Sequence, residues 1–295
     1  MGDPRVLQGR VMIQADQLTY TYTGGQKPAV RQVSFEIRPA EVFGFLGPSG
    51  AGKSTIQKVL IGLLRDYEGS VQVLGADLAS RADDFYERIG VSFEFPNHFL
   101  KLTARENLTY FAALYSRPTL SPQDLLELVG LGADGDMTVS QYSKGMKNRL
   151  SIARALLHEP ELLFLDEPTA GLDPINARRV RDIIRAQQAE GKTVFLTTHD
   201  MAVADELCDR VAFIIDGAIR IIDCPRDLKL RYGRARVAVE YLDKKQLQRR
   251  EFPLPGLGED ADYFALLRDF QIETMHSQEA TLEEVFVAIT GQGLG

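Results

Sequence analysis

At 295 residues, with 44% hydrophobic and 25% charged residues, the chain is long enough for one large domain and a smaller one, and its composition excludes a disordered or fibrous protein. Its net charge of -7 argues against a dedicated nucleic-acid binder, because such proteins usually carry a basic excess. No apolar run approaches the ~20 residues that a transmembrane helix needs. Only two cysteines occur and no charged-then-apolar leader is seen, which favours a cytosolic chain with reduced thiols.

The first part of the chain predicts a strand, a glycine-rich loop and a helix in direct succession. Residues 33–37 alternate apolar and polar side chains, which is the period of a half-buried strand. Residues 42–46 are more continuously apolar, as in a strand buried on both faces. The glycine-rich loop follows directly, and residues 56–64 then place apolar side chains at helical spacing. From about residue 96 to 157 the pattern is mainly helical.

The second part of the chain alternates buried strands with helices. Residues 162–165 and 193–197 read as buried strands, and Gly191 is placed to end the helix between them. Residues 211–215 and 218–222 flank Asp-Gly, which is a strong hairpin signal. Strands that alternate with helices predict an α/β core with a largely parallel sheet.

The character of the sequence changes after Gly233. Residues 236–242 predict a strand, and a charged run and a Pro/Gly-rich stretch follow it. Two helices are expected, around residues 263–270 and 281–289, and the second begins with Thr and Glu spaced as a capping box. We therefore expect a small accessory domain at this end.

The glycine-rich loop matches the pattern G-x-x-x-x-G-K-[ST]. Its residues are Gly47, Pro48, Ser49, Gly50, Ala51, Gly52, Lys53, Ser54 and Thr55. Glycines let successive backbone N–H groups point inward as an anion site, and the following helix adds the positive end of its dipole. Lys53 can reach the β- and γ-phosphates, and the Ser54 hydroxyl can ligate Mg²⁺. The alternative is a chance glycine-rich turn, but the position between a strand and a helix favours binding of ATP and Mg²⁺.

Three polar residues follow the next two buried strands. Asp166 and Glu167 end the first of them, and His199 closes the second. The carboxyl ends of strands line the ligand crevice of an α/β sheet. Asp166 fits the Mg²⁺ shell, Glu167 can polarise the attacking water, and His199 can hydrogen-bond the γ-phosphate or that water. The alternatives are a solvated acidic strand end and a capping histidine; the phosphate loop makes catalysis the preferred interpretation.

With these motifs in order, the chain resembles the nucleotide-binding subunits of ATP-binding cassette (ABC) transporters over about residues 12–230. The segment that carries the resemblance is Tyr142, Ser143, Lys144, Gly145 and Met146, which is similar to the signature motif Leu-Ser-Gly-Gly-Gln at the start of its helix. In that family the motif grips the γ-phosphate of a nucleotide held by a second subunit. Three of the five positions depart from the motif, but the serine and the second glycine remain, so the resemblance implies ATP-driven dimerisation.

The resemblance assigns roles to further residues. It matches Glu167 to the catalytic glutamate, His199 to the switch histidine, and Asp173 to the D-loop that communicates between the two sites. Tyr22 is the expected partner of the adenine ring; Tyr20 is the rival, and either tyrosine could belong to the core.

Glu94 stands where the family has the glutamine of its Q-loop. A carboxylate can still ligate Mg²⁺ or hold a water, but it adds negative charge beside the phosphates. Hydrolysis rate and coupling to a membrane partner are therefore in question. A shift of the alignment by one or two residues is the alternative interpretation.

The resemblance implies an α/β fold with a P-loop NTPase core, namely a RecA-like mixed sheet with an N-terminal antiparallel β subdomain. It also implies an inserted helical subdomain at about 96–157 and a small α+β C-terminal accessory domain. We place the cassette domain at 11–232 and the accessory domain at 233–295.

The signature segment, the Ala-Gly-Leu-Asp run at 170–173 and the tail segment 281–286 are together similar to drug- and lipid-exporter-type cassettes of prokaryotes, which work with a separate permease. The resemblance thus implies a homodimer bound to a transmembrane permease, located in the cytoplasm at the inner face of the cell membrane, with no nucleic-acid partner. Two alternatives stay open: a soluble cassette ATPase that acts on ribosomes or DNA, and a low-turnover regulatory ATP-binding module.

Overall fold

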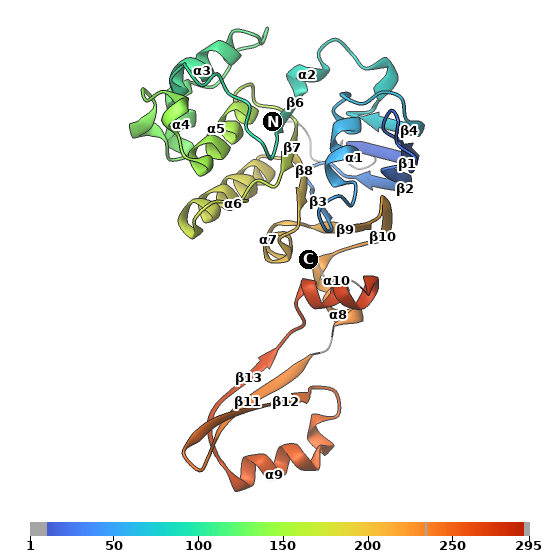
Figure 1. Cartoon of the computed structure of the whole chain (residues 1–295), viewed down its shortest axis with the longest axis vertical. Coiled ribbons are helices and arrows are strands. Elements are labelled where there is room, and N and C mark those ends of the chain that lie inside the picture. Colours follow the sequence, from blue (N-terminus) through green and yellow to red (C-terminus); the bar gives the residue numbers. More distant parts are fainter. Residues whose placement is uncertain (1–10, 234, 292–295) are drawn as a thin grey trace. The chain divides into compact units, whose positions relative to one another are not determined.

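The computed structural model describes residues 11–233 and 235–291, and the chain divides into two compact units (Figure 1). The first unit ends at Ile222 and the second begins at Asp223. The change in sequence character predicts this boundary after residue 232. The difference is α8 (Pro225–Tyr232), which packs against α10 (Leu282–Thr290) and so belongs to the second unit.

The first unit is built around a six-stranded sheet with the order β10-β9-β3-β8-β7-β6. The bounds are β3 Val42–Leu46, β6 Ile89–Ser92, β7 Leu162–Asp166, β8 Thr193–Thr198, β9 Arg210–Ile215 and β10 Ala218–Asp223. The pairs β3–β8, β3–β9, β7–β8 and β6–β7 are parallel. Every residue of β3, β7 and β8 is buried, as their continuously apolar sequences predict. The predicted α/β fold with a largely parallel sheet is confirmed.

A four-stranded antiparallel sheet, β2-β1-β4-β5, lies against the first sheet. Its strands are β1 Ile13–Tyr20, β2 Val30–Ile37, β4 Glu68–Val73 and β5 Ala76–Asp77. Phe35 of β2 contacts Phe43 and Phe45 of β3, with ring centroids 6.1 and 5.0 Å apart. The buried face of α1 (Lys53–Leu60) belongs to the same core cluster. One continuous core therefore holds the loop between β3 and α1.

Helices fill the segment between β6 and β7, with α3 at Ala104–Ala112, α4 at Pro122–Leu128 and α5 at Lys144–Leu156. Regular helix begins at Ala104 rather than near Pro96, because Thr103 and Glu106 form a capping box that starts α3 there. The remaining helices of the unit are α2 Phe85–Arg88, α6 Pro174–Ala189 and α7 Met201–Leu207. Within the part of the chain that the structure describes, no helix combines the length and apolar character needed to cross a membrane.

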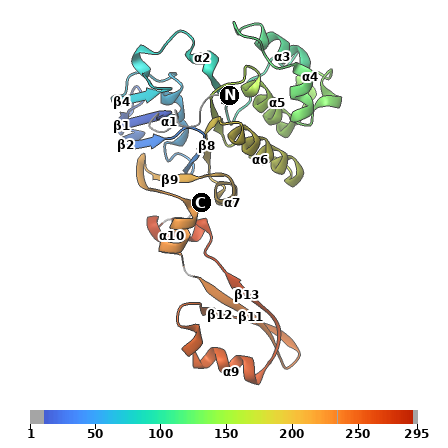
Figure 2. The same cartoon turned by 180° about the vertical axis from the view of Figure 1, so that it is seen from behind.

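The second unit contains a three-stranded antiparallel sheet with the order β12-β11-β13, and α9 (Ala261–Asp269) packs against it (Figures 1 and 2). The strands are β11 Arg236–Asp243, β12 Gln246–Pro253 and β13 Gln271–Gln278. Only β11 was predicted. β12 and β13 show no alternation of apolar and polar residues, because nearly all their side chains are exposed or polar. The β11–β12 turn is equally unmarked, since Lys244 and Lys245 adopt its positive φ angles of 49° and 67° where glycine or asparagine is usual.

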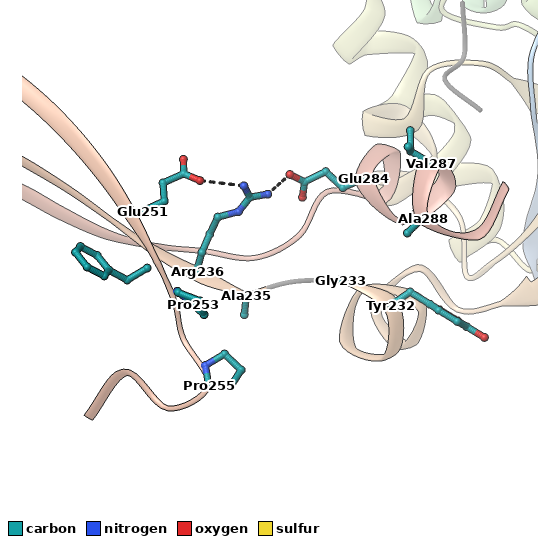
Figure 3. Close-up of a pocket in the computed structure, with 11 residues that line it drawn as sticks. Tyr232, Gly233, Ala235, Arg236, Glu251, Pro253, Pro255, Glu284, Val287 and Ala288 are labelled. Atoms are coloured by element: carbon teal, nitrogen blue, oxygen red, sulfur yellow. Dashed lines mark hydrogen bonds and ion pairs between the residues drawn. The ribbon is translucent and has the colours of Figure 1, made fainter. Parts of the chain in front are cut away.

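An arginine joins this sheet to α10 within the second unit. Arg236 of β11 is ion-paired to Glu251 of β12 and to Glu284 of α10 (Figure 3). Glu284 also accepts a hydrogen bond from the Thr281 backbone in the predicted capping box. A cavity of about 620 Å³ lies beside these residues, far in sequence from the phosphate loop.

The contact of α5 with β6 leaves no room for a side chain at Gly90. A Cβ atom there would lie 2.1 Å from the Ala155 carbonyl oxygen and 2.8 Å from Leu163 Cδ2. We expect Gly90→Ala to lower the free energy of unfolding by about 2 kcal/mol, because the backbone of α5 must shift. Urea unfolding measures this. Gly258→Ala is the control, since its Cβ meets nothing within 4 Å; equal losses in the two variants would contradict the packing argument.

Candidate active site

The phosphate loop connects the end of β3 to the start of α1. Gly52 precedes the helix with φ of 106°, a conformation that side chains disfavour. Gly47 lies so close to β9 that a Cβ would sit 2.2 Å from the Ile214 carbonyl oxygen. Both glycines are therefore required by the backbone path, and the loop ends on the N-terminus of α1, where anions are favoured.

Lys53 is buried in this loop and has only backbone partners there. Its Nζ atom donates to the carbonyl oxygens of Gly47 at 2.6 Å and Pro48 at 3.1 Å. Burial lowers the pKa of Lys53, and the charges of Glu167, Asp166 and Glu94 oppose that shift. A buried ammonium group that bonds backbone carbonyls and faces three carboxylates is suited to receive phosphate oxygens.

Asp166 lies at the end of β7 and bonds to both neighbouring elements. The Ser54 hydroxyl of α1 donates to its Oδ1 at 3.3 Å, and the Thr197 hydroxyl of β8 donates to the same oxygen. Asp166 as a whole is 7% exposed. The Ser54 hydroxyl and the Asp166 carboxylate are hard oxygen ligands of the kind that Mg²⁺ takes, so this pair fits the metal that the sequence predicts.

Glu167 follows Asp166 with a backbone φ of 49°, which is unusual for a non-glycine residue. Glu167 is 8% exposed, and its carboxylate is held from two sides. The Thr198 hydroxyl donates to Oε2 at 3.0 Å, and His199 Nδ1 lies 2.8 Å from Oε1. The backbone turn and the two side chains direct this carboxylate toward the cavity beside Asp166.

These groups border one cavity of about 340 Å³. Its lining residues are Tyr22, Ala29, Ser49, Gly50, Ala51, Gly52, Lys53, Ser54, Thr55, Glu94, Asp166, Glu167 and His199. Nearly every residue that the sequence assigns to the nucleotide site of one subunit therefore lines this cavity. Glu94 is one of them.

The two rival tyrosines have different surroundings. Tyr22 borders the cavity, is 42% exposed and shares a 3.0 Å hydrogen bond with the Thr55 hydroxyl. Tyr20 is 8% exposed and packs edge-on against the Tyr22 ring at 5.0 Å. The geometry therefore leaves Tyr22 as the aromatic ring available to a ligand.

The signature segment does not line this cavity. Ser143 caps α5, and its Oγ accepts from the Met146 backbone N–H at 3.2 Å, so the exposed start of the helix has the form of an anion site. Tyr142 faces inward: its hydroxyl donates to the Asp134 carbonyl at 2.8 Å, and burial raises its pKa to about 12. A Cβ on Gly145 would lie 3.1 Å from Leu172 Cδ2, so a larger side chain there would displace the end of that leucine. Lys144 is exposed.

Asp173 likewise lies outside the cavity and caps α6. Its Oδ1 accepts from the backbone N–H groups of Ile175 and Asn176, each at 3.1 Å. Hydrogen bonds from Asn176 lower the pKa of Asp173. The structure therefore gives Asp173 a helix-capping position within this subunit.

Two residues with a clear place at the site carried no prediction. Thr197 and Thr198 hold the carboxylates of Asp166 and Glu167, one each. Both threonines belong to the run before His199, and both hydroxyls are buried at the end of a strand. The two threonines form a polar pair at the end of an apolar strand, and this pattern in the sequence would have pointed to them.

Comparisons with known proteins agree with this arrangement. The family described as "ABC transporter" matches residues 30–170, and one described as "Fluoroquinolone efflux ABC transporter C-terminal domain" matches residues 235–279. The chain is 53% identical over 287 residues to the fluoroquinolones export ATP-binding protein of Mycobacterium tuberculosis, covering 97% of this chain and 95% of that protein. It is 42% identical over 206 residues to the Nod factor export ATP-binding protein I of Rhizobium meliloti, covering 68% and 62% respectively.

Solved structures give the same answer for the fold. An ATP-binding subunit of an ABC transporter superposes with a TM-score of 0.67 and 28% identity, covering 75% of this chain and 93% of that one. A dimeric ATP-binding cassette in a post-hydrolysis state, bound to ADP and Pi, superposes with a TM-score of 0.65 and 27% identity, covering 72% and 98%. The P-loop NTPase fold and the family resemblance are both confirmed: the chain belongs to the ABC transporter family, as one of its ATP-binding and ATP-hydrolysing export subunits.

Proposed function

We propose that two copies of this chain form two shared ATP sites and that their closure and reopening drive a separate membrane permease. The observation that carries the proposal is the buried Glu167 carboxylate, held by Thr198 and His199 at the cavity that also contains Lys53. A carboxylate fixed in this way is placed to accept a proton from a water that attacks a phosphate.

Within one subunit, the cavity residues divide the work by their chemistry. The loop amides and Lys53 bind phosphate oxygens, and Tyr22 offers its ring to adenine. Ser54 and Asp166 would hold Mg²⁺, with Glu94 as a third oxygen donor nearby, and the metal would neutralise charge on the β- and γ-phosphates. Glu167 would take the proton of the water, and His199 would orient that water or the γ-phosphate.

The position of the signature segment supports a dimer. Ser143 and Gly145 stand at the start of α5, outside the cavity of their own subunit. An anion site in this position does not face the nucleotide of its own subunit. The nucleotide bound by a second subunit would supply the phosphate. One related cassette was solved as a dimer in two separate structures. In such a dimer, Asp173 would stand near the junction of the two sites.

A second cavity of the first unit is suited to the permease. About 470 Å³ in volume, it lies between β6 and the helical segment and includes Phe93, Phe111 and Tyr115 in its wall. Phe95, next to Glu94, is 73% exposed. An aromatic hollow adjoining the Glu94 segment could receive an apolar helix of a membrane protein and pass the state of the nucleotide to it. The chain would then work at the cytoplasmic face of the membrane, without nucleic acid.

The transported substrate is proposed from the relatives alone. The Mycobacterium tuberculosis relative is named for export of fluoroquinolones, and the C-terminal match, residues 235–279, carries the same name. We infer that the chain serves export of drug-sized amphipathic molecules and that the C-terminal unit is an accessory domain of this group of exporters.

Lys53→Ala tests the phosphate site. We expect the ATP affinity to fall about 100-fold, because a buried charged hydrogen-bond donor is lost, and ATP-dependent dimers to disappear. Isothermal titration and analytical ultracentrifugation measure the two effects. Lys58→Ala, in the same helix but outside the cavity, is the control. Unchanged ATP binding in Lys53→Ala would refute the assigned site.

Glu167→Gln tests the general base. The amide keeps the shape of the side chain but cannot accept the proton, so we expect hydrolysis to fall about a hundredfold and an ATP-bound dimer to accumulate. Phosphate release and light scattering measure these quantities, with the exposed Glu159→Gln as control. Full activity of Glu167→Gln would exclude the proposed role.

Glu94→Gln tests the acidic Q-loop position. Removing a negative charge beside the phosphates should lower KM for ATP about threefold and change the basal rate of hydrolysis. Steady-state kinetics with and without permease measures both, and Glu68→Gln on exposed β4 is the control. Kinetics indistinguishable from those of the parent chain would show that Glu94 does not act at the nucleotide.

A further inference from the structure

A short segment connects the nucleotide cavity directly to the helix that carries the signature motif. It starts at Glu94, which borders the cavity, and reaches His98, whose side chain is 9% exposed. No side chain between them is buried. His98 is thus the first buried residue after Glu94, and it packs on α5 rather than on the strand that precedes the segment.

The His98 ring bonds to the first turns of α5. Its Nε2 atom lies 2.9 Å from the Lys147 carbonyl oxygen and 3.1 Å from the Ser151 hydroxyl. Burial lowers the pKa of His98 to about 4, so the ring is neutral near pH 7. Because a carbonyl oxygen can only accept, Nε2 carries the proton and donates it to Lys147. The second ring nitrogen has no partner among the described residues.

The carbonyl that receives this hydrogen bond belongs to the residue that closes the first turn of the helix. The Lys147 backbone N–H donates to the Ser143 carbonyl at 3.0 Å, and Ser143 is the capping serine of the signature segment. Lys147 therefore makes both contacts: its carbonyl oxygen accepts from His98, and its N–H group bonds back to Ser143. A shift of the ring would move this turn with it.

Other bonds restrict the same helix. Arg154 Nη1 donates to the Asn97 carbonyl at 2.7 Å, and its guanidinium lies 4.7 Å from the centre of the Phe111 ring. On the side of the D-loop, Asn148 Nδ2 donates to the Ala170 carbonyl at 3.0 Å. Of these contacts, the one made by His98 joins the Glu94 segment to the first turn of α5, at Lys147. The Arg154 contact lies further along the helix.

We propose that His98 is a positioning residue, which fixes the signature turn of α5 relative to the Glu94 segment so that Ser143 meets the nucleotide of a second subunit. The inference rests on the proposed dimer, and it adds a residue that touches neither nucleotide nor partner. A misplacement of catalytic groups by about 1 Å can lower a reaction rate by about two orders of magnitude. A single hydrogen bond that fixes the position of Ser143 can therefore have a large effect.

The competing interpretation is an ordinary core histidine, and the chain offers a matched control for it. His158, just beyond α5, is 5% exposed and bonds a single backbone carbonyl, that of Ile89, at 2.9 Å. Its ring stacks on Tyr115 at 4.1 Å, and burial lowers its pKa as well. It bonds to β6, and among the described residues no hydrogen bond joins it to the Glu94 segment or to the first turn of α5.

The test uses the full chain with Glu167→Gln, the variant expected to hold ATP with little turnover. Into it we place His98→Gln, whose amide can donate at the position of Nε2, His98→Leu, which keeps the volume but cannot donate, and His158→Leu. ATP-dependent dimerisation is measured by analytical ultracentrifugation, nucleotide affinity at a protein concentration below that of dimer formation, and stability by thermal unfolding.

We expect His98→Leu to weaken dimerisation about tenfold, which corresponds to the loss of one buried hydrogen bond, while ATP affinity stays within about twofold. His98→Gln should restore dimerisation, and His158→Leu should lose thermal stability only. Equal loss of dimerisation in His98→Leu and His158→Leu, or failure of His98→Gln to restore it, would overturn the proposal. If the parent Glu167→Gln chain forms no ATP-dependent dimer, the proposed function itself is wrong, and that outcome is distinct.

Discussion

The parallel pairing of β3, β7 and β8 is the constraint on which the nucleotide cavity depends. Parallel neighbours end at the same edge of a sheet, so the phosphate loop after β3, the two acids at the end of β7 and the histidine after β8 meet there. Each of these strands is buried throughout, so both faces of this part of the sheet are covered. The sheet thus places three distant pieces of sequence within hydrogen-bond distance.

Charge is concentrated at this edge, and the surrounding bonds hold it there. Asp166 and Glu167 are adjacent, almost fully buried carboxylates, and a threonine hydroxyl binds each of them. Lys53 is the buried cation that faces them. Glu94 adds a further carboxylate to the same cavity, so the site is more acidic than one with the glutamine usual in the family. A cation bound at the phosphates would offset such repulsion, so we expect the proposed metal to strengthen nucleotide binding.

The helical segment carries Ser143, which lies outside the nucleotide cavity. Ser143 presents its anion site away from the cavity of its own subunit, and His98 and Asn148 tie its helix to the segments that follow β6 and β7. The signature turn is therefore connected to the sheet edge through two short hydrogen-bonded contacts. In the proposed dimer, a change at Glu94 or at Ala170 would reach Ser143 through these contacts.

The sequence by itself determined the groups that follow local rules. The phosphate loop needs glycines at fixed positions between a strand and a helix, and buried parallel strands need continuous apolar runs, so both are legible in the chain. The acids and the histidine could be assigned because they close such strands. The roles proposed for the signature segment and for Glu94 rest on resemblance to a family, because no local pattern in the chain marks them.

Only the tertiary structure decided the remaining points, because they depend on contacts between residues far apart in sequence. Tyr22 and Tyr20 have the same chemistry, and burial alone separates them. β12 and β13 are polar strands that exist because β11 pairs with both, so no local pattern marks them. α8 joins the second unit through its packing on α10. Thr197, Thr198 and His98 gained their places in the same way: each acts through a hydrogen bond to a residue that only folding brings near.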